Sequence, residues 1–175
     1  MFDETLRIAL IYIHVIAATV WIGGSLTVAL VLVPVSRRIQ PPGAGPRFLR
    51  EAARRFSRIG WVMLLVLVIS GIGILDRSGI DFDVLTGSRF WGTEIGKVLA
   101  IKSSLIGLMI VMTYVHDFIL GPRIADALEG LEPGQRPPPQ VAIERRRLIA
   151  LARVNVLLML SIAALGVMMF RGVPG

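Results

Sequence analysis

Hydrophobic and polar positions follow one another in long blocks along this chain, and four of the blocks contain no charged residue. They cover Ile8–Ser36, Ile59–Leu75, Ser103–Val115 and Val154–Phe170. A hydrocarbon core about 30 Å thick is crossed by roughly 20 residues of α-helix, each adding about 1.5 Å. The third block reaches that length when the apolar residues before Lys102 are included. The pattern therefore predicts four transmembrane helices, at about 7–36, 59–75, 95–119 and 150–170.

The first block carries a stripe of small and polar side chains on an otherwise aliphatic helix. Positions three, four and seven apart share one side of a helix, and here they hold His14, Ala17, Ala18, Trp21 and Ser25. In a membrane helix such a stripe packs against protein, whereas aliphatic faces meet lipid. We therefore expect an all-α fold in which residues 1–175 form a single domain, an integral membrane four-helix bundle.

The charges of the loops predict how the helices are oriented. Residues 37–58 carry seven arginines against one acid and residues 117–153 carry six arginines, whereas residues 76–97 carry three basic and four acidic groups. Loops rich in lysine and arginine stay in the cytoplasm. We expect a multi-pass protein of the bacterial inner (plasma) membrane, with loops 37–58 and 117–153 cytoplasmic and both termini outside, N-out and C-out.

Residues 47–58 form a basic segment directly before the second block. Its arginines recur every three to four residues, opposite apolar side chains, at Arg47, Arg50, Arg54 and Arg58. This spacing predicts a basic amphipathic helix that lies at the membrane surface and leads into the second span.

Composition narrows the functional classes. Hydrophobic residues make up 54% of the 175, more than an ordinary soluble domain carries, and the net charge is +7. The basic residues belong to membrane-flanking loops, so we interpret them as topology signals and contacts with the lipid bilayer, with no nucleic acid as partner. The chain has no cysteine, which excludes disulfides, thiolate zinc sites, iron–sulfur clusters and c-type haem attachment.

Polar groups within the spans are costly and therefore mark candidate sites. The outer half of the bundle contains His14, with Trp21 deeper on the same side, and we expect Lys102 and Met168 at a similar depth. A neutral imidazole is a common metal ligand and holds haem iron in many proteins. We interpret His14 as a ligand of haem iron or copper. For Lys102, snorkelling to the surface and binding of an anionic group both remain open.

The inner half contains His116, Arg153 and Asn155, with Met112 and Met109 on the His116 face of the third helix. His116 stands beside Asp117 at a helix end, so an ion pair is favoured over a metal-ligand role. The two histidines are separated by roughly 18 Å along the membrane normal, and they cannot bind one metal ion together.

Several short motifs resemble known membrane families. The segment His14–Gly24 (HVIAATVWIGG), Phe56-Ser57-Arg58 before a span ending in Ser70-Gly71, and Gly96-Lys97 followed by Lys102 resemble the CopD copper-resistance domain. The same His, Trp and Lys, with Arg153 and Asn155 opening the last helix, are also similar to HemJ-type protoporphyrinogen oxidases. The first resemblance implies movement of copper across the bacterial inner membrane. The second implies b-type haem on His14, supported by Trp21, Lys102, Arg153 and Asn155.

Three functions remain open. The sequence favours a b-haem redox protein, an oxidoreductase that passes electrons between haem and a quinone, a porphyrinogen or a periplasmic electron carrier. The second is a copper-handling membrane protein in which His14 with Met168, or His116 with Met112 and Met109, holds Cu(I). The third is a non-catalytic accessory subunit of a membrane complex or of a homo-oligomer.

Overall fold

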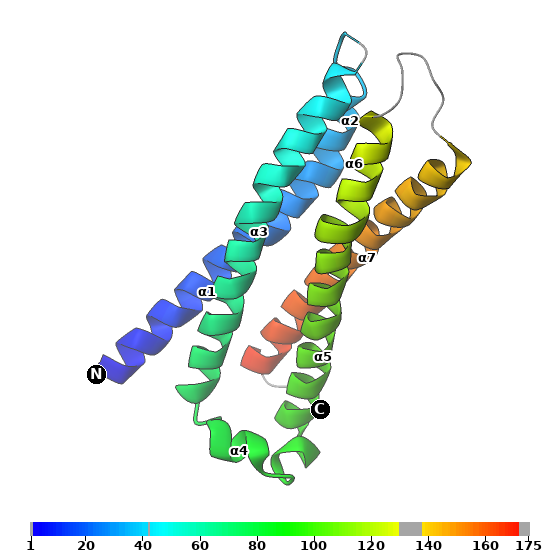
Figure 1. The fold of residues 1–175 in the computed structure, drawn as a ribbon. Helices are drawn as coiled ribbons and strands as arrows, with labels where there is room; N and C mark the ends of the chain where they lie inside the picture. The colour runs from blue at the N-terminus through cyan, green and yellow to red at the C-terminus, as the bar shows by residue number, and fades with distance from the viewer. Residues whose placement is uncertain (1, 42, 130–137, 172–175) are drawn as a thin grey trace. The chain divides into compact units, whose positions relative to one another are not determined.

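The computed structural model describes residues 2–41, 43–129 and 138–171 (Figure 1). These residues form helices and short connections, with no strand among them. In chain order the elements are α1 (Phe2–Thr27), η1 (Val28–Leu32), α2 (Val33–Ser36), α3 (Ala44–Asp76), α4 (Phe82–Thr86), η2 (Phe90–Gly92), α5 (Glu94–Tyr114), η3 (Val115–Leu120), α6 (Gly121–Glu129) and α7 (Pro139–Arg171). The predicted all-α fold is confirmed.

Four helical stretches are long and apolar enough to cross a membrane. They cover Asp3–Ser36, Ala44–Asp76, Glu94–Ala127 and Pro139–Met169. Aliphatic side chains remain exposed on each of them, with Leu30 at 70%, Leu65 at 60% and Leu157 at 64% of their full accessible surface. Exposing leucine side chains to this extent is unfavourable in water but favourable in hydrocarbon. The prediction of four helices able to cross a membrane is therefore confirmed, and their apolar surfaces imply a lipid bilayer around them.

The helices extend beyond the predicted spans. The basic segment 47–58 and the second span form one helix, α3, of 33 residues. The last helix, α7, begins at Pro139, whereas we expected a start near residue 150. Proline suits the first turn because its missing N–H would have no partner there. The arginines that follow are good helix formers, so the helix continues outside the hydrocarbon.

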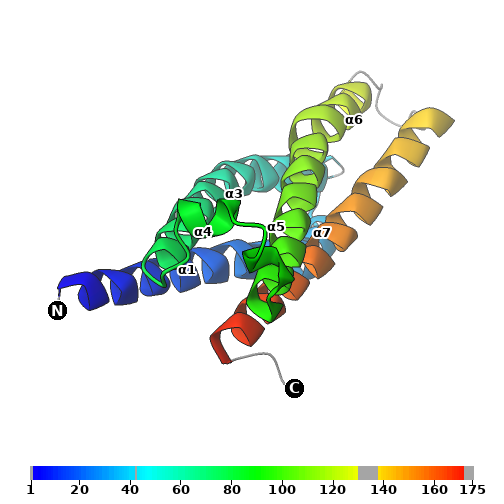
Figure 2. The same cartoon turned by 90° about the horizontal axis from the view of Figure 1, so that it is seen from below.

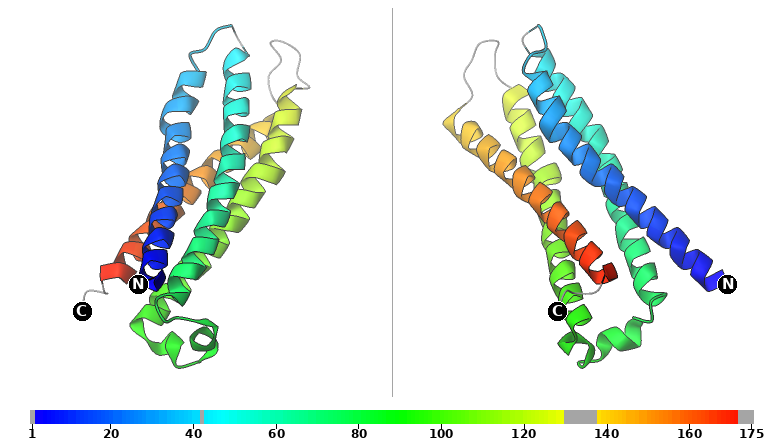
Figure 3. Two further views of the ribbon diagram at one scale, coloured as in Figure 1. Left: turned by 90° about the vertical axis from the view of Figure 1, so that its left-hand side faces the viewer. Right: turned by 180° about the vertical axis from the view of Figure 1, so that it is seen from behind.

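The chain divides into two compact units, Met1–Thr93 and Glu94–Gly175. In the first unit, α1 and α3 pack along each other as an antiparallel hairpin (Figure 3). Gly60 of α3 lies against the indole of Trp21, and a Cβ atom added there would be 3.3 Å from Nε1. Gly73 lies against Leu10 in the same way. Small residues at these positions let two membrane helices approach closely.

The ends of this hairpin are held by tight contacts. At one end Gly45, in the first turn of α3, lies on the backbone of Ser36, so that an added Cβ atom would be 1.8 Å from the Ser36 carbonyl oxygen. At the other end Arg77 forms an ion pair with Asp3. Beyond Arg77 the chain continues through the short helix α4. Figure 2 views the protein from the end at which α4 lies.

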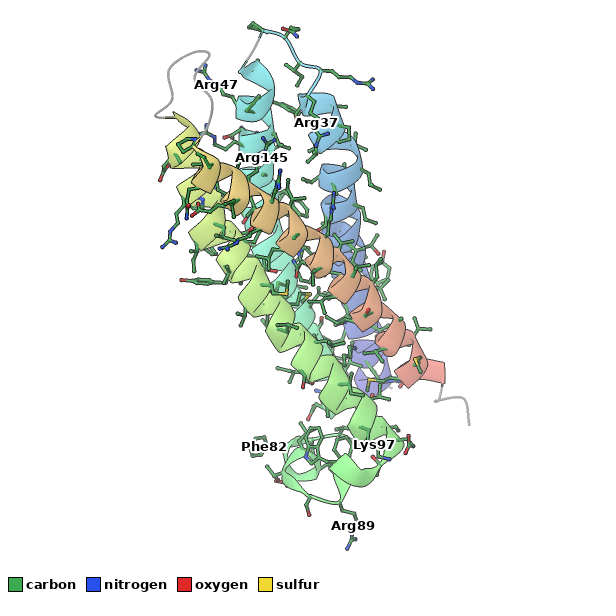
Figure 4. The ribbon with its side chains drawn as sticks, turned by 90° about the vertical axis from the view of Figure 1, so that its right-hand side faces the viewer. Arg37, Arg47, Phe82, Arg89, Lys97 and Arg145 are labelled. Carbon is green, nitrogen blue, oxygen red and sulfur yellow. The ribbon has the colours of Figure 1, made fainter. Side chains whose placement is uncertain are left out.

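The labelled charges gather at the ends of the helices. In the first unit, Arg37 and Arg47 lie at one end, and Arg89 lies at the opposite end beside Phe82 (Figure 4). In the second unit, Arg145 and Lys97 also lie toward opposite ends (Figure 4). The apolar lengths between them fit the hydrocarbon layer, while the charged ends reach the headgroups and water.

The second unit is a hairpin of α5, continued by η3 and α6, against α7. Val98, Leu99 and Met109 of α5 and Met159 of α7 are buried. Between the helices, Asn155 Nδ2 donates a hydrogen bond of 3.0 Å to Thr113 Oγ1. This bond fixes which residues of the two helices lie at the same level.

The contact at Gly45 generates a stability prediction. Gly45→Ala places a methyl group on the Ser36 carbonyl oxygen, and because the obstacle is backbone, we expect a loss of about 1–3 kcal/mol. Thermal unfolding of the detergent-solubilised protein, followed by circular dichroism, measures it. Gly23→Ala is the control, since an added Cβ atom meets nothing within 4 Å. Equal melting temperatures for the two variants would contradict this packing.

Candidate metal site

His14 of α1 lies against α3, where it contacts two neighbouring small residues. Its Nδ1 is 2.8 Å from the Oγ atom of Ser70. A Cβ atom added to Gly71 would lie 3.4 Å from His14 Cε1, so the absence of a side chain there makes room for the ring. Ser70 is 2% exposed. The imidazole is therefore held at a fixed place between two helices.

The Ser70 hydroxyl determines which ring nitrogen of His14 carries the proton. Ser70 Oγ lies 2.6 Å from the carbonyl oxygen of Val66 and donates its single hydrogen there. The same oxygen then accepts a hydrogen bond from Nδ1–H of His14. A neutral imidazole protonated at Nδ1 has its lone pair at Nε2, the arrangement in which a histidine binds a metal.

The predicted stripe on the first helix faces protein. Ala17, one turn from His14, is 2% exposed, and Trp21, one turn further, is 6% exposed. The indole of Trp21 lies on Gly60 of α3, as described above. His14 and Trp21 thus share the α3-facing side of α1, with a small residue between them.

Ser70 and Gly71 are site residues to which sequence reasoning assigned no role. Their sequence signal is a pair of small residues near the end of a span, which many membrane helices show. Only the pairing of α1 with α3 brings Ser70 to His14, residues separated by 56 positions in the chain. The sequence of one helix alone does not predict its register against another helix.

Lys102 and Met168 lie in the second unit. Lys102 points toward α7, because a Cβ atom added to Gly166 would be 3.4 Å from its Nζ atom. Met168 is two residues beyond Gly166, about 200° around the helix, and is 37% exposed. Met169, three residues beyond, is half-buried and closer to the Gly166 side. His14 and Trp21 belong to the first unit, Met1–Thr93.

His116 is paired with its neighbour in the way the sequence suggested. Its Nδ1 lies 2.7 Å from Asp117 Oδ1, and both belong to η3, a π-helical segment that widens the helix after Tyr114. When His116 is neutral, a carboxylate that accepts Nδ1–H leaves the lone pair at Nε2, whereas in the charged ion pair both ring nitrogens are protonated. Along the same helix, Met112 is half-buried and Met109 is 2% exposed.

Arg153 and Asn155, near the middle of α7, differ in their surroundings. Arg153 is exposed. Asn155 donates to Thr113, while its Oδ1 atom is buried with no hydrogen-bond partner among the described residues. A buried amide oxygen without a partner is uncommon in folded proteins.

The donor set limits which ions the chain suits. Among the described residues, no group of three or more histidine, cysteine, aspartate or glutamate side chains is arranged to hold a metal ion. The spans also carry two imidazoles and several thioethers. Imidazole suits copper, and soft thioether sulfur selects Cu(I).

Comparison with known proteins finds one matching protein family and one similar protein. A family model described as "Copper resistance protein D", CopD, matches residues 50–169. The copper transport protein CutJ of Bacillus subtilis (strain 168) is 28% identical over 114 residues, which are 65% of this chain and 19% of that protein. The chain thus spans about a fifth of the length of this curated relative. No solved structure matches significantly.

The Ser70 contact generates a prediction about protonation. In the wild-type protein, nitrogen-15 spectra of labelled histidine are expected to show His14 protonated at Nδ1 and unprotonated at Nε2. Ser70→Ala removes the acceptor, so the two tautomers should mix. Ser104→Ala is the control, because the Ser104 hydroxyl bonds only its own helix, at Ala100. A wild-type His14 protonated at Nε2 would overturn the assignment.

Proposed function

The chain belongs to the copper resistance protein D (CopD) family, and we propose that it is a multi-pass membrane protein that binds copper ions and hands them on within the membrane. Copper is the cargo in this proposal. The family is that of copper resistance protein D, and the similar Bacillus subtilis protein is a copper transport protein, which supports copper over the haem function that the sequence alone favoured.

The observation that carries the proposal is the arrangement of His14. The Ser70 hydroxyl holds Nδ1 at 2.8 Å, which leaves the Nε2 lone pair as the donor. In protein metal sites the second nitrogen of a ligating histidine is commonly bonded in this way, which fixes both the tautomer and the ring orientation. His14 is therefore the primary proposed copper ligand.

The second unit offers further copper donors. In neutral His116 the Nδ1 bond to Asp117 leaves the lone pair at Nε2, and Met112 and Met109 lie on the preceding turns of the same helix. Two histidines in separate units support a protein with more than one binding position. A cargo ion that moves needs successive sites, each strong enough to bind it and weak enough to release it.

Haem b on His14 is the second candidate. The same fixed imidazole supports it, since a single histidine can hold haem iron as the proximal ligand. Bound haem would supply one-electron chemistry toward a quinone, a porphyrinogen or a periplasmic electron carrier. His14 would hold the iron, and Ser70 would keep the ring oriented.

For the membrane, we propose the bacterial inner membrane with residues 37–58 and 117–153 on the cytoplasmic side. The excess of arginine in both segments supports this orientation. An even number of spans puts both termini on the same side of the membrane. Because the first and third connections are cytoplasmic in this proposal, both termini face outward.

Copper binding and haem binding are distinguished by one purified sample. We expect a colourless protein that retains Cu(I) under anaerobic conditions, measured by competition with a chromophoric chelator. His14→Ala should weaken binding more than about 10-fold, since removing only a bonding partner of a metal-bound histidine typically costs 10–100-fold. Thr19→Ala, an exposed change on the same helix, should have no effect. A Soret band that disappears in His14→Ala would overturn copper in favour of haem.

Orientation is testable because the chain contains no cysteine. In intact cells, Ser88→Cys is expected to react with a membrane-impermeant maleimide, since the proposal places the connection after α4 outside. Gln40→Cys should react only after the membrane is permeabilised. Both positions are exposed. Labelling of Gln40→Cys alone in intact cells would reverse the topology.

A further inference from the structure

The second unit contains two buried methionines on facing helices. The sites proposed above do not use them as a pair. Met109 on α5 is 2% exposed and Met159 on α7 is 5% exposed. They are the two least exposed methionines among the described residues. Thioether sulfur is polarizable, and its flexible side chain lets it turn toward a partner or an ion.

The hydrogen bond between the helices places the two methionines at one level. Asn155 Nδ2 donates to Thr113 Oγ1, so these residues face each other across the hairpin. The helices are antiparallel, so four residues back along α5 corresponds to four residues forward along α7. These steps lead to Met109 and Met159. Residues four apart also share a helix face, so all four side chains belong to the α5·α7 contact.

One turn from the methionines is the unpaired oxygen of Asn155. Its Oδ1 atom is buried without a hydrogen-bond partner, although the other half of the same amide is bonded. A buried carbonyl oxygen in this state is unfavourable unless something satisfies it. The negative end of an amide dipole, one turn from two thioether side chains, suits a cation.

We propose that Met109, Met159 and the carboxamide of Asn155 form a Cu(I) subsite inside the α5·α7 hairpin. This subsite rests on the proposed copper function and adds a position to it. All its donors are neutral, and two are soft, the ligand type that selects Cu(I). Neutral donors hold the ion without a thiolate's full charge, and such a site can release its cargo to the next one.

The subsite continues along the helix toward His116. Met109 and His116 are seven residues apart, roughly 10 Å along the helix axis, and Thr113 lies between them on the sequence. From Met109 toward His116, the hairpin thus offers the thioether pair first, then the Thr113–Asn155 contact and last the imidazole of His116. Residues 50–169, which match the family, contain all of them.

The test compares Cu(I) stoichiometry in the full-length, detergent-solubilised protein under anaerobic conditions. The Met109→Leu/Met159→Leu double variant removes both sulfurs with near-isosteric side chains, which membrane and core packing tolerate well. Met63→Leu, a half-buried methionine of α3 in the other unit, is the matched control. Copper K-edge X-ray absorption of each loaded protein reports sulfur neighbours directly.

We expect the double variant to bind one Cu(I) fewer than the wild-type protein and to lose most of the sulfur scattering, while Met63→Leu changes neither. Unchanged stoichiometry and sulfur scattering in the double variant, with copper still bound, would overturn this subsite and leave the His14 site standing. A wild-type protein that binds no Cu(I) at all would overturn the copper function together with the subsite.

Discussion

The hydrogen-bonding requirement of the backbone in hydrocarbon dominates this structure. Inside a bilayer no water is available to satisfy N–H and C=O groups, so a lone segment must bond them internally, and an α-helix does so. This is why the described spans are helical throughout, two of them as single α-helices of 33 residues. Every polar side chain within a span must then find its partner on a neighbouring helix or on its own backbone, and the His14–Ser70 and Asn155–Thr113 contacts are two such solutions.

The same requirement gives the polar contacts their chemical meaning. Ser70 bonds both its own helix and His14, so one hydroxyl satisfies two helices and fixes a tautomer. Asp117 holds the Nδ1 atom of His116 in a similar hydrogen bond. Asn155 is the exception, because half of its amide is unsatisfied. Among the described residues it is the one buried side-chain oxygen or nitrogen without a hydrogen-bond partner, and this is the basis for assigning a subsite to the second hairpin.

The sequence predicted the features that depend on one helix at a time. The four spans, the charged ends and the protein-facing stripe through Ala17 and Trp21 follow from composition and from the period of 3.6 residues per turn. The contact of His14 with Ser70, and the level of Met109 with Met159, depend on the register between two helices. In the first hairpin that register is set by glycines such as Gly60 and Gly73, in the second by the Asn155–Thr113 contact, and no local pattern reveals either. The start of α7 at Pro139 was missed because an arginine-rich stretch looks like a loop when only hydropathy is considered.

The length of α3 has a mechanical consequence. Its 33 residues extend about 50 Å at 1.5 Å per residue, whereas the hydrocarbon core is about 30 Å thick. The arginine-bearing turns therefore form a rigid lever outside the core, continuous with the turns that hold Ser70. One continuous helix thus carries both the arginine-bearing turns and the serine that holds the imidazole.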